Sequence, residues 1–164
     1  MSRLTICFLA GSLIAPVGAQ TSSLAPSEMA IVYFYRVKEA NAQDSRKAGV
    51  KLEGKELLKM PENNFVGFRF APGKYGLRMG QKQPEISLSV KPGKRYFVRV
   101  IQALNGFGLY QSLTLMPEGP AIYQMRDMKP LEDKNIKDKS REVNKDKPVS
   151  RYAAPNNGMH PTPN

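Results

Sequence analysis

Cysteine, histidine and tryptophan are nearly absent from this 164-residue sequence, which has one cysteine, one histidine and no tryptophan. Cys7 lies in an apolar run near the N-terminus, and removal of that run leaves no disulfide, cysteine metal site or thiol catalysis. His160 follows Met159 in a stretch rich in proline and asparagine. A general base must be held within hydrogen-bond reach of its proton, which such a stretch does not favour. We therefore expect no metal site and no catalytic histidine.

Sequence motifs of nucleotide and cofactor sites are missing as well. The chain has no phosphate-binding loop, no dinucleotide fingerprint and no calcium-binding loop. Its serines occur in neither the Gly-x-Ser-x-Gly nor the Ser-x-x-Lys spacing of serine nucleophiles. We therefore expect no cofactor, and a function other than catalysis.

The N-terminal apolar run is typical of a secretory signal peptide. Arg3 gives a positive start, residues 4–14 are apolar, Pro16 breaks the run, and the small residues Val17-Gly18-Ala19 precede Gln20. The run is too short to span about 30 Å of hydrocarbon as a helix. We expect residues 1–19 to be a signal peptide cleaved after Ala19 and residues 20–27 to be a flexible leader.

Lipid anchoring is not expected, because a lipoprotein signal needs a cysteine directly after a Leu-Ala-Gly-like triplet. Here Ser12 follows Leu9-Ala10-Gly11, and Cys7 follows Ile6, which does not fit the triplet. We expect a periplasmic or secreted protein, for which peripheral membrane contact stays open.

Alternating apolar and polar residues dominate the stretch from Asn64 to Gln102, in four short runs. Pro-Gly-Lys turns at residues 72–74 and 92–94 separate some of these runs. A period of two places the apolar residues of each run on one face of a strand. We expect four inward sets to share one core: Val66, Phe68 and Phe70; Tyr75, Leu77 and Met79; Ile86, Leu88 and Val90; Tyr96, Val98 and Val100.

Other segments complete a β-sandwich domain over residues 28–128. Residues 29–37 are apolar on both faces, as in a central strand, residues 50–57 are typical of a hairpin, and residues 109–116 predict a last strand. A helix is expected from Pro120 to Lys129, with Ile122, Met125 and Met128 on its apolar face. Residues 129–164 are charged or rich in proline and asparagine, which predicts a disordered tail.

The order of these segments resembles the bacterial envelope family catalogued as domain of unknown function 2846. The matching segments are residues 31–36 (IVYFYR), 50–55 (VKLEGK), 72–75 (PGKY) and 92–100 (PGKRYFVRV). The Gly-Lys and Pro-Gly-Lys segments are also similar to the PEGA type of small envelope β-sandwich. The resemblance covers roughly residues 28–128 and implies an all-β fold, a single prealbumin- or immunoglobulin-like sandwich of about seven strands. It also implies that members are often anchored by lipid, but this chain has Ser12 where the lipid-bearing cysteine would be expected. The family has no known catalytic residues that could be assigned to this chain.

The basic charge of the chain favours anionic partners. The formal net charge is +11, and a basic surface attracts lipid headgroups or acidic glycans. Nucleic acid is not expected as a partner of an exported protein. Arginine beside an aromatic ring binds carboxylate or phosphate. The outward strand positions that combine these residue types are Arg69, Arg78, Arg95, Phe97 and Arg99.

Three functions remain open at this point. The first is a non-enzymatic, exported cell-envelope module that binds an envelope protein or an anionic polymer through this basic face. The second is a hydrolase of envelope glycans that uses acidic residues such as Glu53, Glu56 or Glu118. The third is a purely structural or assembly protein.

Overall fold

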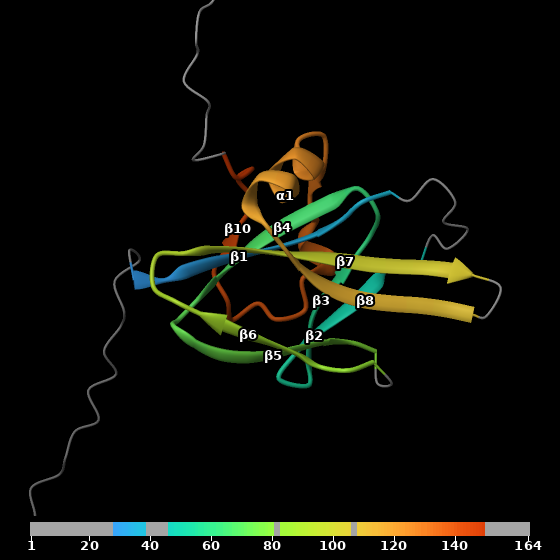
Figure 1. Cartoon of the computed structure of the whole chain (residues 1–164), viewed down its shortest axis with the longest axis horizontal. Helices are drawn as coiled ribbons and strands as arrows, with labels where there is room; N and C mark the ends of the chain where they lie inside the picture. The colour runs from blue at the N-terminus through green and yellow to red at the C-terminus, as the bar shows by residue number, and fades with distance from the viewer. Residues whose placement is uncertain (1–27, 39–45, 81–82, 106–107, 150–164) are drawn as a thin grey trace, which may run out of the picture.

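The computed structural model describes residues 28–38, 46–80, 83–105 and 108–149. The predicted signal peptide, the leader and His160 lie outside these residues. Ten strands of the described chain form two sheets that pack face to face, with one α-helix against the larger sheet (Figure 1). The expected all-β sandwich with a short helix is therefore confirmed, with eight strands of five residues or more. The elements are β1 (Ala30–Arg36), β2 (Ala48–Leu52), β3 (Lys55–Met60), β4 (Asn64–Phe70), β5 (Gly73–Met79), β6 (Ile86–Val90), β7 (Arg95–Asn105), β8 (Gly108–Met116), α1 (Glu118–Met125), β9 (Lys129–Pro130), the 3-10 helix η2 (Asp133–Asn135) and β10 (Val143–Asn144).

The larger sheet, sheet A, has the strand order β10-β4-β1-β7-β8, and β9 also pairs with β4. Strand β1 lies in its centre, antiparallel to β4 and parallel to β7. The smaller sheet, sheet B, has the order β3-β2-β5-β6 and is antiparallel throughout. Because β1 has a paired strand on either side, the prediction of a central strand over residues 29–37 is confirmed.

The core between the sheets consists of the residues that the alternation predicted to point inward. Nine of the twelve are buried, and Tyr75, Ile86 and Tyr96 pack partly buried against them. The last strand contributes Leu113, whereas Leu115, two residues further along, is 48% exposed. The other buried members come from β1, the β2–β3 hairpin and the C-terminal segment: Ala30, Val32, Phe34, Ala48, Val50, Leu52, Leu57, Leu58, Met60, Leu131 and Ile136.

A second apolar cluster lies on the outer face of sheet A, beneath α1. Ala121 and Met125 of the helix, and Met128 just after it, pack on Tyr33 and Tyr35 of β1. The helix spans residues 118–125 rather than 120–129, but its predicted apolar side does cover the sandwich. Both faces of β1 are therefore buried, since the even-numbered residues of the strand face sheet B and the odd-numbered residues face the helix.

The C-terminal segment, which we define as residues 129–149, runs along one side of the sandwich and joins the two sheets. It begins as β9, beside the start of β4. Ile136 then forms a bridge with Leu58 of β3, and the backbone amides of Lys137 and Asp138 donate to the Leu57 carbonyl. The segment returns to sheet A as β10, antiparallel to β4. It therefore covers the edge of β3 in sheet B and the edge of β4 in sheet A.

This arrangement corrects the prediction that disorder begins at residue 129. Twelve of the 21 residues in the segment are charged, which is the composition of a disordered chain. However, Leu131 and Ile136 are 1% and 4% exposed, and the backbone hydrogen-bonds to two exposed strand edges. A few buried apolar groups and satisfied edge hydrogen bonds are enough to order a charged segment. Residues 150–164 lie outside the described residues.

Candidate binding surface

The five residues predicted to form a basic face do not share one surface. Arg95, Phe97 and Arg99 lie on β7 and Arg69 on β4, all on the outer face of sheet A. Arg78 lies on β5, between inward Leu77 and Met79, and therefore faces out from sheet B. The outer faces of the two sheets point in opposite directions, so Arg78 is separated from the other four.

Phe97 is not available to a partner, because it is 2% exposed beneath α1. Its ring stacks on Tyr33, with centroids 5.4 Å apart and planes 9° apart. The Tyr35 hydroxyl donates to Gln124 Oε1 on the helix at 3.0 Å. The prediction that Phe97 lies on an exposed polar face is wrong, because the helix converts this face into a second core.

The arginines around this second core are engaged within the protein. Arg95 forms an ion pair with Glu118 in the first turn of α1 and donates to the Val149 carbonyl at 2.9 Å. Arg69 forms an ion pair with Glu142 of the C-terminal segment at 2.8 Å. Arg99 is half-buried beside Tyr35 on the neighbouring strand. Arg95 and Arg69 therefore fasten α1 and the C-terminal segment to sheet A through ion pairs that engage their charges.

Burial beneath the helix also changes the tyrosines. Desolvation raises the pKa of Tyr35 to about 12, and the positive charge of Arg99 opposes the rise only in part. The pKa of Tyr33 is raised for the same reason and is opposed mainly by Arg95. Both hydroxyls therefore stay protonated in the folded protein at neutral pH, as expected for packing residues rather than for proton-transfer groups.

The outer face of sheet B carries basic side chains and is not covered by α1. The α-helix of the described chain packs on sheet A, so sheet B carries no helix on this side (Figure 1). Lys51 of β2 lies directly opposite Arg78 of β5, and Lys74 lies opposite Ser89 on β6. Lys59 of β3 is exposed and lies opposite Gly49. The sequence alone did not predict a role for these lysines. The position of Lys51 between the inward residues of β2 would have indicated that its side chain faces outward.

Carboxylates occupy one part of this face and leave another part positive. The Glu53 carboxylate accepts a hydrogen bond from the Gly76 amide, and the Glu85 carboxylate lies directly over Gly76, where a Cβ would collide with it. Glu56 forms an ion pair with Lys59 at 3.7 Å. Nε of Arg78 is buried and has no hydrogen-bond partner within the described residues, and the same holds for Nε of Arg95 on sheet A. Lys51 lies in register between Glu56 of β3 and Arg78 of β5, so its neighbours across the sheet are one carboxylate and one cation.

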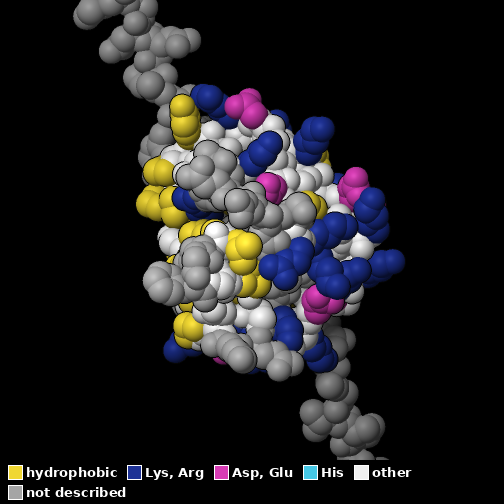
Figure 2. Space-filling model, turned by 90° about the vertical axis from the view of Figure 1, so that its right-hand side faces the viewer, with side chains coloured by type: hydrophobic (Ala, Val, Ile, Leu, Met, Phe, Trp, Pro, Cys, Tyr) yellow, Lys and Arg dark blue, Asp and Glu magenta, His cyan; other side chains and the backbone are white. Residues whose placement is uncertain are grey.

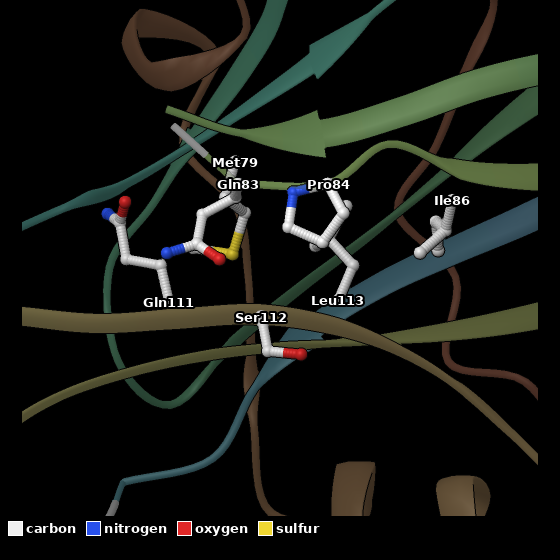
Figure 3. Close-up of a pocket in the computed structure, with 7 residues that line it drawn as sticks. All are labelled: Met79, Gln83, Pro84, Ile86, Gln111, Ser112 and Leu113. Carbon is white, nitrogen blue, oxygen red and sulfur yellow. The ribbon is translucent and has the colours of Figure 1, made fainter. Parts of the chain in front are cut away.

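The small cavity in Figure 3 lies where the open edges of the two sheets meet. It is enclosed by residues of β5, β6 and β8 and of the turn before β6: Met79, Gln83, Pro84, Ile86, Gln111, Ser112 and Leu113. Its volume of about 40 Å³ admits water, whereas pockets for organic ligands measure roughly 300–1,000 Å³. The cavity is thus a gap in side-chain packing and not a substrate site.

Of the three glutamates considered for hydrolysis, Glu118 is separated from the other two. Glu118 is paired with Arg95 beside sheet A, whereas Glu53 and Glu56 border a surface depression of about 290 Å³ together with Asp138. Hydrogen bonds from the Ser140 side chain lower the pKa of Asp138, which keeps it ionised. A glycosidase needs one carboxyl group whose pKa is raised, so that it can donate a proton. The lowered pKa of Asp138 favours the ionised carboxylate, which has no proton to donate.

In the described part of the chain, no three His, Cys, Asp or Glu side chains lie close enough together to hold a metal ion. Within the same residues, no helix has both the length and the apolar character that a membrane crossing requires.

One comparison with known proteins gives a match. The model of a family described as a protein of unknown function (DUF2846) matches residues 26–107. The match ends at the β7–β8 turn, so β8, α1 and the C-terminal segment lie beyond it. No curated protein and no solved structure matches the chain.

Proposed function

The chain belongs to the DUF2846 family, whose description assigns no activity, and from that premise we propose a function in binding. The protein is a non-enzymatic interaction module of the bacterial cell envelope. It is exported through residues 1–19 and binds an anionic polymer or partner. The surface that binds is the outer face of sheet B, centred on Lys51 and Arg78, rather than the helix-covered face of sheet A.

The observation that carries this proposal is the register of Lys51 and Arg78. The two cations are direct cross-strand neighbours on a face without a covering helix. Like charges directly opposite each other destabilise a sheet, at a cost on the order of a few tenths of a kcal/mol. A carboxylate or phosphate between them offsets that repulsion, and the planar arginine fork suits either group.

Binding of the purified protein to defined polymers tests the proposal. The probes are polygalacturonate for carboxylates, polyphosphate for phosphates and uncharged dextran as the blank. We expect binding to the anionic polymers only, weakening as salt rises, because exposed charges are screened over about 8–10 Å. The double variant Lys51→Gln/Arg78→Gln should bind roughly 5- to 30-fold more weakly, since two partly exposed contacts of up to about 1 kcal/mol each are removed.

A matched variant separates a site from net charge. Lys137→Gln/Lys139→Gln removes the same two charges from exposed positions of the C-terminal segment and should leave affinity nearly unchanged. Equal weakening by both double variants, or affinity independent of salt, would contradict the proposal. Release of sugar from an envelope glycan that is abolished by Glu56→Gln would instead favour the hydrolase.

A further inference from the structure

The β7–β8 hairpin extends past the strand that lies beside it. Strand β1 pairs with β7 only as far as Arg99, while β7 and β8 stay paired to Asn105 and Gly108. Figure 1 shows the hairpin projecting from one end of the sandwich. Its base is fixed, because buried Arg36 donates to the Gln102 carbonyl at 3.4 Å and to the Arg46 carbonyl at 2.7 Å.

The end of the hairpin carries apolar side chains, and no charged residue lies among them. Residues 100–117 contain no charged residue, in a protein in which 24% of residues are charged. Among the described residues, six large hydrophobic side chains are exposed, and four of them belong to this hairpin. Leu104 and Leu109 lie opposite each other at 43% and 39% exposure, and Tyr110, opposite Ala103, is 50% exposed. Tyrosine has an apolar ring and a polar tip, and favours membrane–water interfaces.

Cationic side chains flank the base of the hairpin. Gln102 Nε2 donates to the Arg46 carbonyl at 3.0 Å, which places the exposed Arg46 beside β7. Lys38 is also exposed, and it follows the end of β1 that lies next to β7. The Glu62 carboxylate at this base is neutralised by Arg36 at 3.3 Å. Figure 2, which faces this end of the molecule, shows hydrophobic side chains on one side and a group of Lys and Arg side chains on the other.

We infer that the tip of the β7–β8 hairpin inserts into the surface of an anionic lipid bilayer. Leu104, Leu109 and the Tyr110 ring enter the boundary between headgroups and acyl chains, and the flanking cations contact the anionic headgroups. The three residue-to-residue steps from Gln102 to Asn105 span about 10 Å at roughly 3.4 Å per step, which is the depth of an interfacial contact. The polymer-binding face is not involved, so this inference is independent of the proposed function.

The absence of tryptophan provides a direct measurement. Tyr110→Trp gives a protein with one tryptophan at the tip, and Tyr123→Trp gives the matched control on α1, where Tyr123 is 65% exposed. Each is mixed with vesicles of equal parts phosphatidylglycerol and phosphatidylcholine, and with vesicles of phosphatidylcholine alone. We expect a blue shift of tryptophan emission for the Tyr110 variant with the anionic vesicles, a weaker shift with the neutral vesicles, and none for the Tyr123 variant.

Substitutions at the tip then test the contact itself. Adding Leu104→Ser and Leu109→Ser to the reporter should weaken vesicle binding about 10-fold or more per leucine, whereas Lys51→Gln/Arg78→Gln should leave the blue shift in place. Both leucines are exposed, so an unchanged urea midpoint verifies folding. Equal shifts at positions 110 and 123, or no shift at any lipid concentration, overturn the inference. A concentration-dependent dimer that is dissociated by the two serines, without vesicle binding, assigns the tip to a second copy of the chain instead.

Discussion

The two long edges of the sandwich differ in a way that their compositions do not suggest. On the β3/β4 side, the C-terminal segment is charged at more than half of its residues, yet it packs on both sheets and pairs with β4. On the opposite side, β8 has no charged residue at all, yet it pairs only with β7 within the described residues. Charge therefore does not decide which segments are ordered or covered in this protein. A segment is ordered where it can pair with a strand edge and place its apolar side chains in a recess of the core.

The difference also separates structural from interaction surfaces. Natural proteins protect exposed strand edges with charges, prolines or a covering segment. Strand β8 has none of these in its nine residues, whereas the β3 and β4 edges are covered. The covered edge contributes to stability, and the open edge with its hairpin is where we expect contact with other molecules.

Removal of the C-terminal segment should have the largest effect. A chain that ends at Met128 loses Leu131 and Ile136 from the core and leaves the carbonyls of Leu57 and Phe65 without their partners in the segment. We expect it to aggregate or to unfold without a cooperative transition in urea. A chain that ends at Val149 is the control and should keep the full-length midpoint. Equal midpoints for the two truncations would remove the distinction between the edges.

Single substitutions make the same comparison more quantitative. Ile136→Ala or Leu131→Ala should lower the free energy of unfolding by about 2–4 kcal/mol, because each leaves a cavity in the core. Leu115→Ala on the open edge should change it by less than about 0.5 kcal/mol, because Leu115 is 48% exposed. Urea denaturation measures all three. A loss at Leu115 as large as that at Ile136 would show that the open edge is buried in solution.

Arg141 of the C-terminal segment gives a smaller effect. Its guanidinium lies 4.6 Å from the ring centroid of Phe70 and 5.8 Å from that of Tyr75. Arg141→Gln should cost about 0.5–1 kcal/mol, a loss typical of a partly exposed cation–π contact. Arg126→Gln is the control, since Arg126 lies 4.5 Å from the centroid of the exposed Tyr123 ring and should cost less. Equal losses would mean that the segment gains nothing from lying on the core aromatics.

Acid should weaken the covered edge slightly, through Asp138. Hydrogen bonds from Ser140 lower the pKa of this carboxyl below its ordinary value. A lowered folded-state pKa contributes stability that is present above the unfolded pKa and is lost as pH falls through the folded pKa. Asp138→Asn should therefore flatten the fall in urea midpoint below about pH 4, whereas Leu115→Ala should retain the full acid dependence. Identical acid profiles for the wild type and Asp138→Asn would assign the dependence to other carboxylates.

The strands were predictable because burial on one face leaves a period of two in the residues. For this reason the sequence predicted which residues of β4 to β7 point into the core, and that β1 is buried on both faces. The candidate site was predictable only in part. Alternation correctly predicted that Phe97 and Arg78 point away from the core between the sheets. It carries no information about which outer face is covered by a helix that follows later in the chain.

By itself, the sequence determined a sandwich with one core, a helix that docks through Ile122, Met125 and Met128, and membership of a family without an assigned activity. Tertiary structure alone decided that α1 covers Phe97, that Arg78 faces Lys51 on the other sheet, and that a charged C-terminal segment joins the sheets at one edge. The reason is physical. Periodicity records whether a residue is buried by its own strand's neighbours, whereas helix docking and edge pairing depend on contacts between segments far apart in the chain.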